Sequence, residues 1–243
     1  MTISNDSRTR IKGIFEPIAL AMGRAGLTPD GLTLIGFAIT VVGAILLASQ
    51  QWLIGGIVVF IGGVFDMFDG TLARATGKVS PLGAFMDSVF DRWGEVIVYV
   101  GIVIGCVMAP FSEGAVAASA ALGAAVMVSY VRSKSEGLGF TAGTGMAAVG
   151  LMPREIRLVI LSLGLVVAGL AGGVGWYPVP AGEVRVDDPL RTGSIVLLLA
   201  LAAIAVGGTI TVIQRILHVR AQANRTSTNP EAGPPASNGE ANT

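Results

Sequence analysis

The 243-residue sequence has few charged side chains, a single cysteine and a single histidine. Charged residues make up 13% of the chain and the formal net charge is zero, so the sequence lacks the basic surface that binding to nucleic-acid phosphates requires. The one cysteine, Cys106, has no partner for an intrachain disulfide, and its place within an apolar run indicates a buried, inert thiol. A nucleic-acid partner and a disulfide framework are therefore excluded.

Apolar residues dominate what remains. They make up 52% of the chain, and the mean hydropathy is +0.72. A helix needs about 20 apolar residues to cross the hydrocarbon of a bilayer. Six runs of suitable length are present, at about 32–49, 53–73, 82–109, 114–131, 157–175 and 193–214. The sequence thus predicts an all-α integral membrane protein with six transmembrane helices between about residues 32 and 217.

The distribution of Lys and Arg predicts the orientation of these helices, because short loops rich in positive charge stay in the cytoplasm. With both ends inside, the cytoplasmic segments carry thirteen Lys and Arg residues and the outer segments carry two, Arg185 and Arg191. The pattern predicts a multi-pass protein of the cytoplasmic membrane with its N- and C-termini in the cytoplasm.

The segments outside the six runs differ in character. Residues 1–9 are polar, and the predicted membrane domain spans 10–220. Within it, residues 11–24 carry apolar side chains at helical spacing with charges between them, which favours an amphipathic helix lying in the membrane interface. Residues 221–243 are rich in Pro, Asn, Ser and Gly, so we expect a disordered cytoplasmic tail as well as a disordered N-terminus.

Four aspartates interrupt the second and third apolar runs. Asp66 and Asp69 are three residues apart, and Asp87 and Asp91 are four apart, so each pair projects from one face of its helix. The short loop 74–81 makes the two helices antiparallel neighbours and brings both pairs to the cytoplasmic end. A carboxylate at membrane depth costs about 3 kcal/mol or more on insertion scales, which favours a functional site.

Such a cluster needs cations. Arg74 and Arg92 could offset two charges, and an all-oxygen carboxylate set suits hard divalent ions such as Mg²⁺ or Mn²⁺, two of which would form a clamp for phosphoryl chemistry. Two other interpretations remain open from the residues alone. The carboxylates could be helix-end groups paired with arginine, or they could belong to a cation-coupled transporter.

The full pattern is Asp66-x2-Asp69-Gly70-x2-Ala73-Arg74-x8-Gly83-x3-Asp87-x3-Asp91, eight fixed residues over 26 positions. It resembles the signature of the CDP-alcohol phosphotransferases at every defined position. The resemblance implies an enzyme in which an alcohol attacks the lipid-side phosphate of a CDP-linked lipid and CMP leaves. It also implies that Asp66, Asp69 and Asp87 bind two Mg²⁺ ions, with Mn²⁺ as a substitute, and that Asp91 is a further ligand or the general base.

The resemblance also implies a nucleotide site and a phosphate site. CDP-lipid contacts would come, beside Asp66 and Asp69, from Pro29, Asp30, Thr33, Gly70, Ala73, Arg74, Ser80 and Gly83. The segments SYVRSKSEGLG, REIR and IQR are similar to those of the inositol-phosphate-using branch, in which basic residues hold the acceptor phosphate. The matching residues here are Arg132, Arg157 and Arg215, with Lys134 and Arg154 as second choices.

The sequence therefore predicts transfer of the phosphatidyl group from CDP-diacylglycerol to inositol 1-phosphate, giving phosphatidylinositol phosphate. The alternative within the family is a phosphatidylglycerophosphate synthase that uses glycerol 3-phosphate, and the remote alternative is the transporter. Members of the family commonly form homodimers, so the resemblance also implies a homodimer.

Overall fold

The computed structural model describes residues 5–140, 146, 149–175 and 191–228, and every regular element in these ranges except a single 3₁₀ residue at Met146 is an α-helix. The helices are α1 (Asn5–Arg24), α2 (Pro29–Ala48), α3 (Trp52–Ala75), α4 (Pro81–Met108), α5 (Ser112–Gly137), α6 (Arg154–Leu170) and α7 (Thr192–Thr228). The prediction of an all-α protein is confirmed. Four helices, α2, α3, α5 and α7, are long and apolar enough to cross a membrane.

Helices α2 to α7 run roughly side by side, and their main contacts close a ring in the order α2, α3, α6, α7, α5 and α4. Small residues let the helices approach closely. A Cβ added to Gly101 of α4, for example, would lie 2.4 Å from the carbonyl oxygen of Ala44 in α2. The core between the helices contains Cys106, which is fully buried as predicted.

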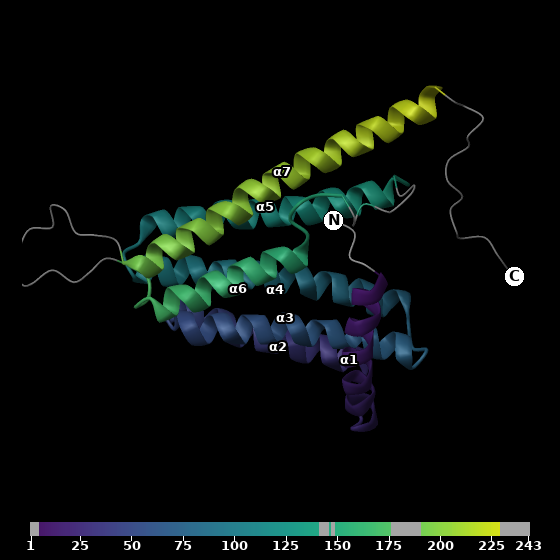
Figure 1. Ribbon diagram of the computed structural model, residues 1–243, viewed down its shortest axis with the longest axis horizontal. Coiled ribbons are helices and arrows are strands. Elements are labelled where there is room, and N and C mark those ends of the chain that lie inside the picture. The colour runs from purple at the N-terminus through teal and green to yellow at the C-terminus, as the bar shows by residue number, and fades with distance from the viewer. Residues whose placement is uncertain (1–4, 141–145, 147–148, 176–190, 229–243) are drawn as a thin grey trace, which may run out of the picture.

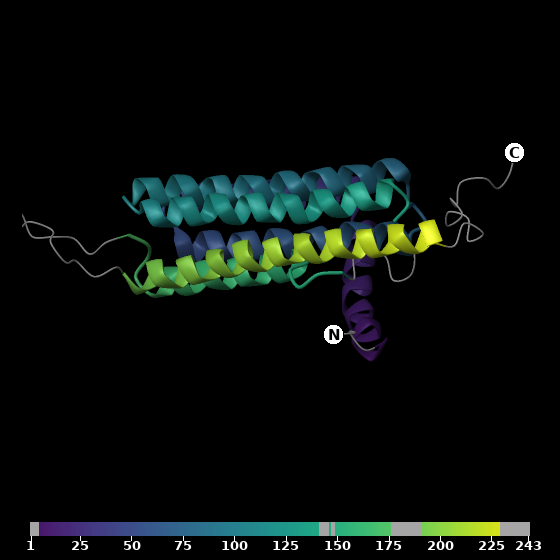
Figure 2. The same ribbon diagram turned by 90° about the horizontal axis from the view of Figure 1, so that it is seen from above.

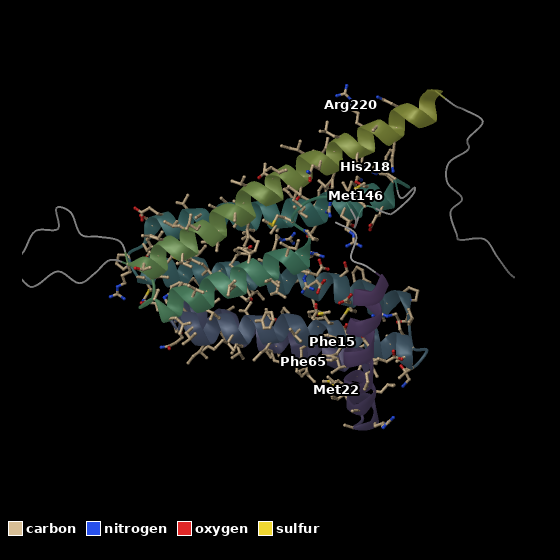
Figure 3. All side chains as sticks on the ribbon, in the orientation of Figure 1. Phe15, Met22, Phe65, Met146, His218 and Arg220 are labelled. Carbon is tan, nitrogen blue, oxygen red and sulfur yellow. The ribbon has the colours of Figure 1, made fainter. Side chains whose placement is uncertain are left out.

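Helix α1 lies across one end of the bundle, as both ribbon views show (Figures 1 and 2). It packs on α3 through aromatic and aliphatic side chains, with the rings of Phe15 and Phe68 5.2 Å apart. Figure 3 shows Phe15 and Met22 of α1 beside Phe65 of α3. Helix α1 begins at Asn5, so residues 5–9 are helical where the sequence predicted disorder; residues 1–4 lie outside the described ranges.

Three helix ends differ from the sequence prediction. Helix α6 ends at Leu170, five residues before the predicted end, because Gly172 and Gly173 adopt positive φ angles of 91° and 84° that an α-helix cannot contain. Helix α5 continues to Gly137. Helix α7 continues to Thr228, through residues 221–228 that we expected to be disordered, while 229–243 lie outside the described ranges.

Capping residues fix the starts of helices α2 and α4. Thr28 caps α2 by accepting a hydrogen bond from the Gly31 amide (3.1 Å), and Pro29 follows at the first helical position. Ser80 caps α4 in the same way by accepting from the Gly83 amide (3.0 Å). These caps set where α2 and α4 begin, at the end of the bundle where the aspartates lie.

Candidate active site

The structure brings the aspartates of α3 and α4 together. One carboxylate oxygen from each of Asp66, Asp69 and Asp87 lies within 4.8 Å of the others, close enough to share a cation. All donors are carboxylate oxygens, the ligands that hard divalent ions prefer. The chemistry of this set therefore fits a divalent metal ion, in agreement with the sequence prediction that a metal binds here.

A threonine from α2 orients the most buried of these carboxylates. The Thr33 hydroxyl donates to Asp69 Oδ2 at 2.5 Å, and the Gly70 amide donates to Asp69 Oδ1. Asp69 is 5% exposed. Burying a carboxylate without hydrogen bonds is costly, so Thr33 and Gly70 stabilise Asp69 in a defined orientation.

Asp91 lies at the other edge of the cluster, one turn along α4 from Asp87. Arg154 of α6 connects it to Asp66: Nη1 of Arg154 donates to Asp66 Oδ2 at 2.7 Å, and Nη2 lies 2.8 Å from Asp91 Oδ1. Arg92 adds a longer ion pair to Asp91, at 3.8 Å. Arginines from α4 and α6 thus offset part of the negative charge of the cluster.

A pocket of about 230 Å³ opens beside the carboxylates, between the starts of α2 and α4 and the end of α3. Its volume is several times the roughly 30 Å³ that a water molecule occupies, so it can hold part of an organic ligand. Nine of the ten residues that the resemblance implies for the CDP-lipid line it; the tenth, Asp66, belongs to the carboxylate cluster. The nine are Pro29, Asp30, Thr33, Asp69, Gly70, Ala73, Arg74, Ser80 and Gly83.

Two glycines leave room in this pocket. A Cβ on Gly83 would lie 3.1 Å from Ser80 Oγ and 3.5 Å from Asp30 Oδ1, and a Cβ on Gly70 would lie 3.2 Å from Arg74 Nη1. The bare backbone at both positions therefore lets polar side chains, or a ligand in their place, come close to the helices.

The five basic residues predicted for an acceptor phosphate have different surroundings. Arg154 pairs with the aspartates, and exposed Arg132 pairs with Glu136 on the same helix at 3.0 Å. Lys134 is exposed in the last turn of α5. Arg92, Arg132 and Arg157, which come from α4, α5 and α6, lie close enough to Arg215 of α7 to interact with it electrostatically.

Arg157 and Arg215 are buried and donate to protein groups. Arg157 is 1% exposed; its Nε and Nη2 donate to the two carboxylate oxygens of Glu95 at 2.8 and 3.0 Å, and its Nη1 donates to the carbonyl of Met152. Arg215 is 2% exposed and donates to the carbonyls of Val128 (2.5 Å) and Val149 (2.9 Å). Arg157 therefore joins α6 to α4, and Arg215 joins α7 to α5 and to the segment before α6.

Sequence reasoning missed Glu95 and Thr211. Glu95 continues the spacing of Asp87 and Asp91, with each acid four residues after the last, and this periodicity could have revealed it. Thr211 of α7 accepts hydrogen bonds from the amides of Leu151 (3.1 Å) and Met152 (2.9 Å), just before α6. No local signal marks Thr211, because its partners are about 60 residues away in the sequence.

A membrane-embedded helical bundle with a carboxylate cluster and an adjoining pocket defines the class, an integral membrane enzyme with a metal-binding site. Residues 26–222 match the family described as CDP-alcohol phosphatidyltransferase, and the chain belongs to this family. The membership confirms the resemblance of the motif and identifies the chain as a transferase.

Similar proteins carry related names. The chain is 36% identical to the archaetidylinositol phosphate synthase of Pyrococcus horikoshii, over 63% of this chain and 77% of that protein. It is 34% identical to the phosphatidylinositol phosphate synthase of Mycobacteroides abscessus, over 88% and 87%.

Solved structures of the phosphatidylinositol phosphate synthase of Mycobacterium tuberculosis have the same fold. The structure with CDP-DAG bound has a TM-score of 0.67 at 27% identity, covering 85% of this chain and 93% of that one. The structure in complex with manganese and citrate has a TM-score of 0.68 at 27% identity, covering 85% and 88%.

Proposed function

We propose that this protein transfers the phosphatidyl group of CDP-diacylglycerol to inositol 1-phosphate, forming phosphatidylinositol phosphate and CMP. The observation that carries the proposal is the pocket in which the residues of the family motif meet the carboxylate cluster. The choice of acceptor draws on the phosphatidylinositol phosphate synthases that the chain resembles over most of its length.

In this proposal Asp66, Asp69 and Asp87 hold two Mg²⁺ ions, for which Mn²⁺ can substitute. Bound there, the ions supply polarisation of the diphosphate and offset the charge that develops on CMP. Thr33 and the Gly70 amide keep the Asp69 carboxylate turned toward the cluster. Arg74 and the other pocket residues hold the CDP group against it, with Arg74 acting as a fork of donors to a phosphate.

Asp91 is the proposed general base, and it could also serve as a metal ligand. Its carboxylate accepts the proton of the acceptor hydroxyl while that oxygen forms a bond to the lipid-bearing phosphorus, and the bond from this phosphorus to the CMP oxygen breaks. Its position at the edge of the cluster, beside the basic residues, supports this role, because the attacking hydroxyl must lie between the acceptor site and the diphosphate.

For the acceptor phosphate we assign direct contact to Arg132, Lys134 and Arg154, which are exposed or partly exposed. Arg157 and Arg215, which the sequence suggested as direct ligands, receive a positioning role, because their guanidinium groups already donate to Glu95 and to backbone carbonyls. A converging set of cations suits an anionic acceptor and leaves serine or choline without a matching charge.

The deciding experiment measures CMP release from CDP-diacylglycerol by the purified protein with Mg²⁺ and one acceptor at a time. We expect release with inositol 1-phosphate, and none with unphosphorylated inositol. Turnover with glycerol 3-phosphate in preference to inositol 1-phosphate would establish the alternative acceptor. Cation flux into proteoliposomes without CMP release would instead establish the transporter and refute the transferase.

The proposed arrangement in the membrane uses all six helices of the ring. Helices α4 and α6 pack among the four that are long and apolar enough to span, which supports their spanning as well. The membrane domain then covers about residues 10–220 of the cytoplasmic membrane, with both termini and the active site on the cytoplasmic side and α1 in the interface. The position of α1 across the bundle end supports this placement. We also propose a homodimer.

A further inference from the structure

Arg154 connects two carboxylates that have different proposed tasks. Its Nη1 lies 2.7 Å from Asp66, a proposed metal ligand, and its Nη2 lies 2.8 Å from Asp91, the proposed base. The two carboxylates come from α3 and α4, and the arginine comes from α6. One planar guanidinium therefore joins three helices at the edge of the metal site.

The contact between Arg154 and Asp66 opposes the binding of two metal ions at the carboxylate cluster. The oxygen of Asp66 that accepts from Arg154 is Oδ2, and a carboxylate oxygen engaged by a guanidinium is a weaker ligand for a second cation. Two cations near one carboxylate also repel each other, most strongly where water is partly excluded. Asp66 and Asp91 are each only 13% exposed, so solvent screens little of this repulsion.

The side chain of Arg154 is also placed so that it can move away from the two carboxylates. It is the first residue of α6, directly after Pro153, and its side chain is 31% exposed, compared with 2% for Arg157 one turn further on. The five-atom reach of an arginine side chain lets the head group move while the helix stays in place. The exposed Arg132 and Lys134 near the end of α5, which are assigned to the acceptor phosphate, mark where a phosphate would draw it.

We propose that Arg154 is an exchangeable counter-cation of the carboxylate cluster. It offsets part of the negative charge of Asp66 and Asp91 in the empty enzyme, and it moves to the acceptor phosphate when divalent ions load. This inference rests on the proposed function. Its consequence is that metal binding and acceptor binding reinforce each other. Either ligand separates Arg154 from Asp66 and Asp91, which leaves the carboxylates available to metal and the guanidinium available to phosphate, and such coupling is reciprocal.

The test measures Mn²⁺ binding to the full-length protein in nanodiscs by electron paramagnetic resonance, without turnover. In the wild type, inositol 1-phosphate should increase Mn²⁺ affinity about fivefold, and unphosphorylated inositol should not. In Arg154→Gln, Mn²⁺ should bind about fivefold more tightly without any phosphate, and the increase caused by inositol 1-phosphate should largely disappear.

Arg92→Gln is the matched control, since it removes the same charge from a residue that pairs with Asp91 and Glu95. Its effect on Mn²⁺ affinity should be clearly smaller. Equal tightening by both variants, or wild-type affinity and coupling in Arg154→Gln, would overturn the proposal. If Arg154→Gln does not fold, Arg154→Lys serves instead, because one ammonium bridges two carboxylates less well and should give an intermediate shift in the same direction.

Asp69→Asn separates this inference from the proposed function. If Asp69→Asn leaves Mn²⁺ binding unchanged, the proposed metal site itself is wrong. If Asp69→Asn weakens Mn²⁺ binding while Arg154→Gln does nothing, the metal site stands and only the role of Arg154 is refuted.

Discussion

At the scale of single residues, the site combines acids from α3 and α4 with partners from other helices. Asp69 is oriented by Thr33 of α2, and Asp66 and Asp91 are joined by Arg154 of α6. One turn deeper, Glu95 holds Arg157 through two hydrogen bonds. Asp69, the Asp66 and Asp91 pair, and Glu95 therefore have different partners, and the consequences of removing these acids should differ.

Asp91→Asn tests the proposed base. The amide cannot accept the hydroxyl proton, so we expect CMP release to fall by at least about a hundredfold. Binding of CDP-diacylglycerol should persist, because Asp91 does not line the pocket that holds the motif residues. The measurements are CMP release and equilibrium binding of the CDP-lipid. A variant that retains near-normal turnover would contradict the assignment.

Glu95→Gln tests the buried ion pair. Without Glu95, the 1%-exposed Arg157 keeps its charge and loses its counter-ion, so the free energy of unfolding should fall by about 3 kcal/mol. The midpoint of thermal unfolding in detergent reports this loss. Combining Glu95→Gln with Arg157→Met removes both charges and should recover much of the stability; a double variant less stable than Glu95→Gln alone would argue against the pair as the cause.

At the scale of elements, the segment before α6 decides where the basic residues lie. Thr211 accepts from the amides of Leu151 and Met152, and Arg215 donates to the carbonyl of Val149. Helix α7 thereby sets the start of α6 and with it Arg154. Helix α7 also continues beyond this contact, since its 37 residues span about 55 Å, well beyond the roughly 30 Å hydrocarbon layer.

Thr211→Val tests this connection. The valine keeps the shape of the side chain but leaves the two amides without their acceptor, which should destabilise the segment by about 1–3 kcal/mol. The Michaelis constant for the phosphorylated acceptor should rise more than that for the CDP-lipid. Thr209→Val is the control, because Thr209 is exposed and its hydroxyl donates to the carbonyl of Ala205 in the same helix. Equal changes in both Michaelis constants would refute the connection.

At the scale of the whole molecule, the ring of helices α2 to α7 separates two ends. One end carries α1, the pocket and the extension of α7, and the other carries the connections after α2 and α4 (Figure 1). Figure 3 shows His218 and Arg220 on the last part of α7, where this helix diverges from the others, which fits a position at the interface. The proposed topology places the first of these ends in the cytoplasm.

Cysteine labelling tests the topology. Lys78 and Gln51 are both exposed and lie at opposite ends of the bundle, and the native Cys106 is fully buried, so it should give little background. In intact cells, a membrane-impermeant maleimide should label Gln51→Cys and leave Lys78→Cys unlabelled until the cells are broken. The reverse pattern would invert the proposed orientation.

The sequence determined the family, the helical fold and the location of the carboxylate cluster, because these depend on local features: apolar runs long enough to span, caps at Thr28, and acids spaced for one helix face. Only the tertiary structure decided which cation meets which acid. Arg154 and Asp66 are 88 residues apart, and Arg157 and Glu95 are 62 apart, so their pairing depends on how helices pack. Local spacing carries no information about partners that far away, and for this reason the sequence favoured Arg157 and Arg215 as phosphate ligands although both are buried and already bonded.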